Sequence, residues 1–149
     1  MPFKQIRRLA YLAAITVLAF VEMGRSGLSR RTFEFFTFNS HRPVVEDRLV
    51  HKTTSLEEDI KAYVEELILG PVSVGFAPLL TRGTKLHSFM FRNGTVYANF
   101  SRDAVIPVPG GVSLLEGFSA LNRGIRRNFG AVSEVKLFAG GNEVFFGEF

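Results

Sequence analysis

The stretch Lys85–Ser101, KLHSFMFRNGTVYANFS, decides the fold class of this chain. Asn93-Gly94 lies at its centre and is a favoured pair for a two-residue hairpin turn, because both residues tolerate positive φ. Strand-forming residues continue on both sides of the pair, so the stretch predicts two adjacent antiparallel strands. The fold must therefore contain a β-sheet.

The register of this hairpin separates its side chains onto two faces. One face is apolar and should pack inward; its facing pairs are Phe91 with Val96, Phe89 with Ala98, and His87 with Phe100. The other face is half polar and is a candidate contact surface; it carries Ser88, Met90, Tyr97 and Asn99. His87 lies at the edge of the apolar face, where a structural role is the simpler interpretation.

Amphipathic helices are predicted before and after the hairpin. The first begins after Ser55, which forms a capping box with Glu58, and ends at Gly70-Pro71. The second begins at a capping box of Ser113 and Glu116. The expected buried stripes are Leu56, Ile60, Tyr63, Val64, Leu67 and Ile68 in the first helix, and Leu114, Phe118, Leu121, Ile125 and Phe129 in the second.

Gly117 and Gly124 lie inside the second helix, although glycine costs about 1 kcal/mol at such a position. We expect them to allow the close approach of another segment. The helix ends with an arginine cluster, Arg123, Arg126 and Arg127. The cluster is either a solvated end that complements the helix dipole or a site for an anionic partner.

The remaining elements complete a mixed fold. Further strands are predicted at Thr32–Phe38, Val44–His51, Ser133–Ala139 and Glu143–Phe146. The expected order is ββαββαββ, which predicts an α+β two-layer sandwich. Its mainly antiparallel sheet of about five to six strands should carry both helices on one face. The apolar segment Ala104–Gly111, which contains Ile106, is either tucked onto the domain or a partner-binding loop.

The N-terminus resembles a membrane-targeting segment. Leu9–Val21 is uncharged and follows Lys4, Arg7 and Arg8. Its 13 residues would span about 20 Å as a helix, against about 30 Å for a bilayer core. We expect an N-terminal hydrophobic helix in residues 1–23, serving as an uncleaved signal-anchor or a cleaved signal peptide. A linker at 24–31 and one domain at 32–149 should follow, with the domain outside the cytoplasm of a single-pass membrane protein.

The charge distribution argues against a nucleic-acid partner. Residues 32–149 contain 12 basic and 13 acidic side chains, so the excess behind the net charge of +4 flanks the N-terminal hydrophobic segment. A nucleic-acid-binding domain requires its basic excess on the folded surface. The chain has no cysteine, which excludes disulfides and thiolate metal sites.

Motifs of catalysis are missing as well. The three histidines, His41, His51 and His87, lie on separate elements without metal-ligand spacing. No phosphate-binding glycine loop or nucleophile elbow is present. We therefore expect neither an enzyme nor a cofactor nor a metal site. Dispersed groups such as His87, Asp103 and Glu116 keep an unrecognised hydrolase as the least favoured alternative.

Four ordered segments resemble the GerMN domain of sporulation and spore germination proteins. Glu65–Pro71 resembles its helix end, and the segment from Pro78 through Arg82–Leu86 resembles its "P-x-GTKL" stretch. Asn93–Ser101 resembles its hairpin, and Val135–Gly147 resembles its closing segment. The resemblance covers roughly residues 32–149 and implies a tethered extracytoplasmic domain in assemblies of the cell envelope, including sporulation complexes in spore formers.

The expected function is a non-enzymatic protein-binding or scaffold module of the bacterial cell envelope. Its partners would be envelope proteins or further copies of the chain, with the membrane contacted through Leu9–Val21. Binding of cell-wall polymer such as peptidoglycan, through the arginine cluster, is the alternative. The candidate partner-binding residues are Met90, Tyr97, Asn99, Ile106, Arg123, Arg126 and Arg127.

Overall fold

The computed structural model describes residues 8, 11–17 and 27–144. Within residues 27–144 the helices are α2 (Leu56–Leu69), α3 (Leu114–Asn128) and the short 3-10 helix η1 (Arg102–Val105). The strands are β1 (Leu28–Thr37), β2 (Pro43–His51), β3 (Phe76–Ala77), β4 (Leu86–Arg92), β5 (Thr95–Phe100), β6 (Glu134–Ala139) and β7 (Asn142–Val144). The order differs from the expected ββαββαββ by two additional short elements, β3 and η1.

The strands form two separate sheets. Sheet A is antiparallel, with the order β2-β1-β3. Sheet B has the order β4-β5-β6-β7, and its central pair, β5 with β6, is parallel. A parallel pair requires a crossover connection, which α3 supplies.

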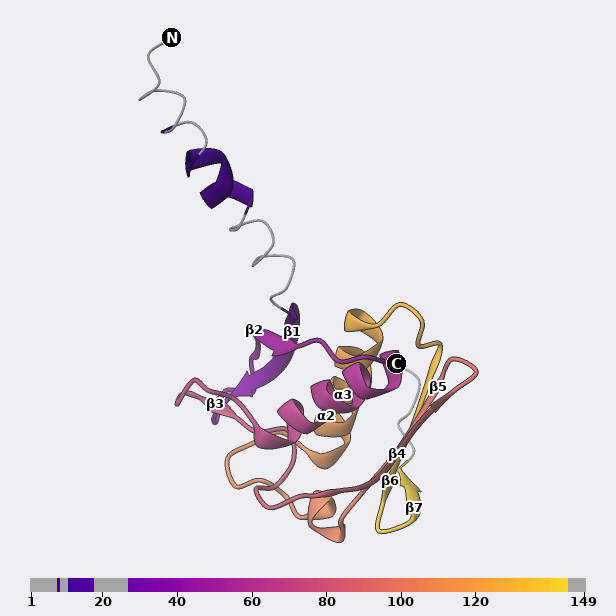
Figure 1. Cartoon of the computed structure of the whole chain (residues 1–149). Coiled ribbons are helices and arrows are strands. Elements are labelled where there is room, and N and C mark those ends of the chain that lie inside the picture. Colours follow the sequence, from indigo (N-terminus) through magenta and orange to yellow (C-terminus); the bar gives the residue numbers. More distant parts are fainter. Residues whose placement is uncertain (1–7, 9–10, 18–26, 145–149) are drawn as a thin grey trace.

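The two long helices lie between the two sheets (Figure 1). α2 contacts β2 of sheet A and β4 of sheet B, while α3 contacts β1 and β6. The prediction of one sheet with both helices on a single face is therefore wrong. Among the described strands, β1 pairs only with β2 and β3, which divides the expected sheet into two.

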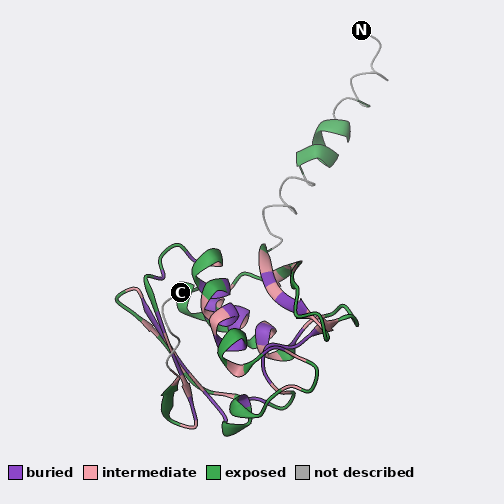
Figure 2. Cartoon of the chain, turned by 180° about the vertical axis from the view of Figure 1, so that it is seen from behind, coloured by how far each residue is buried: buried purple, intermediate pink, exposed green. Residues whose placement is uncertain are grey.

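Aromatic side chains fill much of the core between these layers. Figure 2 shows buried residues on the helices and on the strands that face them. Phe33 of β1 stacks on Tyr63 of α2 with ring centroids 4.6 Å apart. Phe100 of β5 meets Phe118 of α3 edge to face at 6.1 Å. Each helix thus joins a sheet through paired rings.

Gly117 and Gly124 permit the close approach predicted for them. A Cβ atom on Gly117 would lie 2.4 Å from the carbonyl oxygen of Leu79. A Cβ atom on Gly124 would lie 2.6 Å from the hydroxyl oxygen of Tyr63 in α2. Both distances are far below van der Waals contact, so each neighbour occupies space that a side chain would need.

The helix starts agree with the sequence in part. Ser113 and Glu116 form the full capping box at α3. At α2, the Ser55 hydroxyl accepts a hydrogen bond from the Glu58 backbone N–H, while the Glu58 carboxylate accepts one from Thr54. Leu56 was expected in the buried stripe, but it is 41% exposed because it lies at the first turn of the helix.

The central hairpin confirms two of the three predicted facing pairs, Phe91 with Val96 and Phe89 with Ala98. The pairing of His87 with Phe100 is wrong. A register shift between Leu86 and Ser88 makes Leu86 face Phe100 and leaves His87 exposed. A bulge adds one residue to a strand, and it turns the following side chains to the opposite face.

The outer strands differ from expectation at their ends. β1 begins at Leu28, so the last four residues assigned to the linker belong to the strand. β7 ends at Val144, and the rest of the predicted final strand lies outside the described residues.

A side-chain amide covers part of the free edge of β1. Asn128, at the end of α3, accepts a hydrogen bond from the Thr32 N–H (3.0 Å) and donates one to the Thr32 carbonyl (2.8 Å). The Tyr63 hydroxyl donates to the same carbonyl at 2.9 Å. Asn128 therefore bonds β1 as a neighbouring strand would.

Residues 11–17, inside the expected membrane segment, are helical and exposed. The rest of Leu9–Val21 lies outside the described residues. Within the described ranges, no helix combines the length and apolar character needed to cross a bilayer.

Candidate functional site

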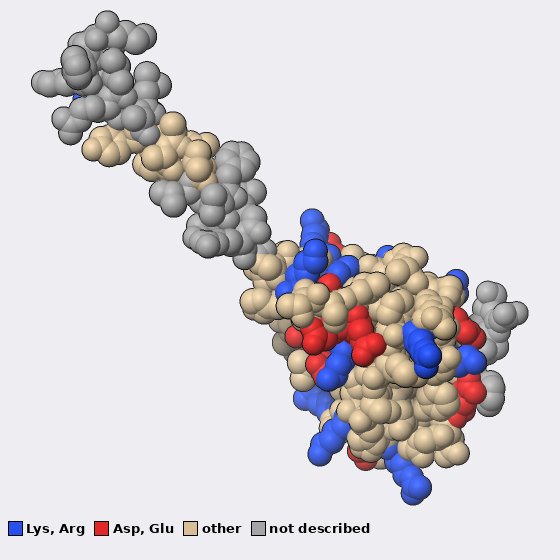
Figure 3. Space-filling view, turned by 45° about the vertical axis from the view of Figure 1, so that its right-hand side comes forward, with Lys and Arg blue, Asp and Glu red and all other residues tan. Residues whose placement is uncertain are grey.

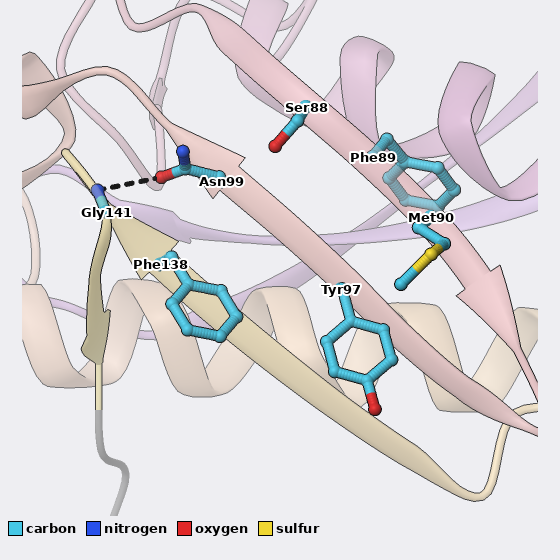
Figure 4. Close-up of a pocket in the computed structure, with 7 residues that line it drawn as sticks. All are labelled: Ser88, Phe89, Met90, Tyr97, Asn99, Phe138 and Gly141. Carbon is cyan, nitrogen blue, oxygen red and sulfur yellow. Dashed lines mark hydrogen bonds between the residues drawn. The ribbon is translucent and has the colours of Figure 1, made fainter.

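The outward side of sheet B contains a shallow hollow, which we call the sheet B face. Its volume is about 390 Å³, and its lining residues are Ser88, Phe89, Met90, Tyr97, Asn99, Phe138 and Gly141. Figure 4 shows the Tyr97 ring between the side chains of Met90 and Phe138. The sheet B face therefore joins apolar and polar groups from β4, β5, β6 and the turn that follows.

Strand alternation places these side chains outward. Val96, Ala98 and Phe100 of β5 are buried, so Tyr97 and Asn99 between them point away from the core. Both are half-buried by their neighbours on adjacent strands. Met90 faces Tyr97 in the register and is 44% exposed. The structure thus brings together the three hairpin residues that the sequence singled out, Met90, Tyr97 and Asn99.

A hydrogen bond fixes the polar end of the sheet B face. The Gly141 N–H donates to Asn99 Oδ1 at 3.1 Å, as the dashed line in Figure 4 shows. Gly140 and Gly141 both have positive φ, so the turn between β6 and β7 folds tightly over the end of β5. The Asn99 amide is held in one orientation before any partner binds.

Sequence reasoning missed Phe138. Val135, Leu137 and Ala139 of β6 are buried, and Phe138 points to the opposite side. The same alternation is present in the sequence, but its meaning depends on which strand lies beside β6. The parallel pairing of Asn99 with Phe138 joins residues 39 positions apart through a crossover connection, which local patterns do not reveal.

The other four candidate residues lie elsewhere. Ile106, 50% exposed, lies in the loop after η1. Arg123 of α3 forms an ion pair with Glu34 of β1 at 2.6 Å. Arg126 and Arg127 are exposed in the last turn of α3. The seven candidates therefore form three groups rather than one site.

Two of the three groups considered for hydrolysis, Asp103 and Glu116, have a local structural role. The Asp103 carboxylate accepts a hydrogen bond from the Ser101 hydroxyl at 3.0 Å. The Glu116 carboxylate belongs to the capping box of α3. The third, His87, is exposed and lines a groove between α2 and β4 with Glu57, Glu58, Lys61 and Glu65. This groove adjoins the sheet B face at Ser88 and Phe89. Across the described residues, no three histidine, aspartate or glutamate side chains gather in a way that could hold a metal ion.

Perturbed ionisation occurs away from the sheet B face. Burial raises the pKa of Tyr63, which lies in the core against β1. Hydrogen bonds from Thr32, and then from Arg30, hold the pKa of Asp47 below its ordinary value on the outer side of sheet A. Both shifts arise from contacts that join structural elements. They therefore do not mark a catalytic group.

Comparisons with known proteins agree with this fold. The model of a protein family described as Germane, sporulation and spore germination, matches residues 35–145. The first GerMN domain of the sporulation protein GerM from Bacillus subtilis superposes with a TM-score of 0.56 at 19% identity, over 78% of this chain and 86% of that chain. The tandem GerMN domains of the same protein give 0.57 at 19% identity, over 79% of this chain and 41% of that chain.

A candidate lipoprotein from Clostridium perfringens is also similar. Its TM-score is 0.51 at 20% identity, over 79% of this chain and 78% of that chain. A comparison with curated protein sequences gives no match. At these identities, the solved structures establish a common fold.

Proposed function

This chain belongs to the Germane family of sporulation and spore germination domains, and from that premise we propose that it is a protein-binding module of the bacterial cell envelope. The proposal assigns binding to the sheet B face. In this role the domain holds another protein and performs no chemical reaction, and a link to sporulation applies if the source bacterium forms spores.

The single observation that carries the proposal is the composition of the sheet B face. Tyr97, Phe138 and Met90 offer apolar area, while Asn99 and Ser88 offer hydrogen bonds. Aromatic residues and methionine are enriched at protein interfaces, and aromatic rings bury large areas with few rotatable bonds. The hollow is open and shallow, which suits a protein surface better than an enclosed small molecule.

A protein partner also agrees with the charge pattern. Figure 3 shows basic and acidic side chains interspersed over the folded domain on the side in view. Residues 32–149 have nearly equal numbers of the two charges. Nucleic-acid binding depends on a concentrated basic surface, so we assign no nucleic-acid partner.

The proposed location is the outer side of the bacterial cell membrane. The uncharged segment Leu9–Val21 follows three basic residues, as in signal-anchors and signal peptides. The similar Clostridium perfringens protein, as a candidate lipoprotein, is a further reason to propose membrane association. In this arrangement the domain begins a few residues beyond the bilayer surface.

The proposal is tested by capture from native membranes. The full-length protein is crosslinked in cells, purified, and its adducts are identified by mass spectrometry. Tyr97→Glu should lower partner recovery at least tenfold, because it places a charge in the centre of the sheet B face. The matched control is Leu49→Glu, which makes the same kind of change at a residue 67% exposed in β2 of sheet A.

Thermal unfolding first establishes that both variants fold. Loss of the partner from Tyr97→Glu, with retention by Leu49→Glu, supports the proposal. Equal recovery by the two folded variants would show that the partner binds elsewhere.

Binding of an anionic cell-wall polymer is the second candidate. Arg126 and Arg127 are exposed, and neither forms an ion pair within the described part of the chain. Arg123 is paired with Glu34, so only Arg126 and Arg127 of the predicted cluster are available to an anionic polymer. Cosedimentation of the full-length protein with purified wall should then fall as salt rises, and the Arg126→Glu, Arg127→Glu double variant should abolish it.

A further inference from the structure

A second hollow, which we call the loop cup, lies beyond the C-terminal end of β1. Its volume is about 270 Å³, and its lining residues are Phe38, Pro78, Thr81, Arg82, Val108 and Pro109. The lining is apolar except at Thr81 and Arg82. The loop cup shares no lining residue with the sheet B face.

Hydrogen bonds fix the loops that form the cup. The Phe38 N–H donates to the Gly75 carbonyl at 3.5 Å, and the Asn39 N–H donates to the Gly110 carbonyl at 3.1 Å. The Thr81 hydroxyl donates to the Ile106 carbonyl. Segments after β1, after β3 and after η1 are therefore tied to one another. A hollow formed in advance lowers the entropy lost when a partner binds.

The surface of the cup and its surroundings are unusually apolar for exposed loops. Phe38 is 38% exposed and Ile106 is 50% exposed. The segment Ala104–Gly111 is anchored at its start and exposed beyond it. Ala104 is buried, while Val105, Ile106 and Pro107 are exposed to solvent. Contiguous exposed apolar surface of this kind marks an interaction site.

The size and charge of the loop cup indicate what it accepts. An apolar cavity of about 150 Å³ holds a benzene ring, so the larger cup can admit a phenyl side chain. Arg82 is exposed, and it forms no ion pair or hydrogen bond with another described residue. The cup therefore selects an aromatic side chain that is followed or preceded by a carboxylate.

The chain contains such a segment. Residues 145–149, which follow β7, are Phe-Phe-Gly-Glu-Phe. Their three phenylalanines match the apolar lining, and Glu148 matches Arg82. We infer that the loop cup of one copy binds residues 145–149 of a second copy.

The geometry favours a second copy over the same one. Figure 1 shows β7 and β3 on opposite sides of the helix pair. A helix layer is about 10–12 Å thick, and five residues reach at most about 18 Å when fully extended. A path from the end of β7 around the helix layer to the loop cup of the same copy is longer than this reach. Because the two contacting surfaces differ, the contact can repeat from copy to copy.

The test measures self-association of the full-length protein in detergent by sedimentation velocity. Val108→Asp places a charge in the cup and should weaken association at least tenfold. Val74→Asp is the matched control, since Val74 is 96% exposed and does not line the cup. Thermal unfolding shows whether Val108→Asp folds.

A charge exchange tests the pairing without relying on that variant. Arg82→Glu and Glu148→Arg should each weaken association, and the two changes together should restore it. A benzophenone amino acid at position 149, in a mixture of 14N and 15N protein, should form adducts with residues 78–82 or 105–109 of the other label. The inference would be overturned by any of three results. The protein could remain a monomer at every concentration, the adducts could form within one label only, or the double variant could associate no more tightly than the single variants.

The outcome is separable from the proposed function. Tyr97→Glu, in the sheet B face, should leave self-association unchanged. Val108→Asp should leave capture of a protein partner unchanged.

Discussion

At the scale of the single residue, Gly124 sets how closely α3 approaches α2. A Cβ atom there would meet the Tyr63 hydroxyl oxygen at 2.6 Å. We expect Gly124→Ala to destabilise the domain. Its steric cost of about 1–3 kcal/mol exceeds the gain of about 1 kcal/mol in helix propensity. Chemical denaturation measures the change.

Two further variants make this prediction specific. Gly130→Ala should change stability by less than about 0.5 kcal/mol, because nothing lies within 4 Å of its Cβ position. Tyr63→Phe removes the oxygen that Gly124→Ala would meet, so the alanine should cost less in that background. An equal cost in both backgrounds would assign the effect to something other than this contact.

The buried phenol of Tyr63 predicts a loss of stability in alkali. Burial raises its pKa above the ordinary value of 10.0. The folded state therefore binds the phenol proton more tightly than the unfolded state does. The stability that comes from this difference is fully present below the ordinary pKa and is lost as the pH rises above it.

Denaturation at a series of pH values between about 9 and 11 measures this loss. Tyr63→Phe should flatten the curve of stability against pH, because it removes the buried phenol. Tyr11 and Tyr97 remain in both proteins and so contribute equally to the two curves. A variant curve parallel to the original would contradict the assignment to Tyr63.

At the scale of the element, Asn128 attaches α3 to the edge of β1. Asn128→Ala leaves the half-buried Thr32 N–H without its acceptor, and a fully buried unpaired group costs about 1–3 kcal/mol. We expect a loss at the lower end of that range, about 1 kcal/mol, and faster hydrogen exchange at the Thr32 amide. The control is Asn122→Ala on the same helix, because the Oδ1 atom of Asn122 has no hydrogen-bond partner within the described chain. Equal losses from the two variants would contradict the role of Asn128.

The sequence predicted elements better than it predicted their assembly. Asn93-Gly94 gave the register near its turn because turn geometry acts locally. The bulge at His87 has no such marker, so the register beyond it was wrong. The division into two sheets depends on which distant strands pair, and among the described strands β1 pairs only with β2 and β3. For the same reason, alternation found Tyr97 and Asn99 but not Phe138, whose place depends on the parallel pairing of β5 with β6.

At the scale of the whole molecule, the proposed topology is open to direct measurement. A reporter enzyme that is active only after export, fused after Phe149, should be active in cells. The same reporter fused after Met1–Arg8 alone, without the hydrophobic segment, should be inactive. Activity of a cytoplasm-only reporter at Phe149 would contradict an outward-facing domain.

The bond between Thr32 and Asn128 joins residues 96 positions apart, and it sets an order of events during synthesis. β1 leaves the ribosome early, but the helix end that covers its edge follows only after about ninety further residues. At about 5–20 residues per second, that interval lasts several seconds or more. Until then β1 presents an unpaired edge, to which chaperones or other nascent chains can bind. A chain that stops before α3 should therefore be degraded or held by a chaperone. Synthesis of the final quarter of the sequence thus determines when the free edge of β1 is covered and can no longer pair with other chains.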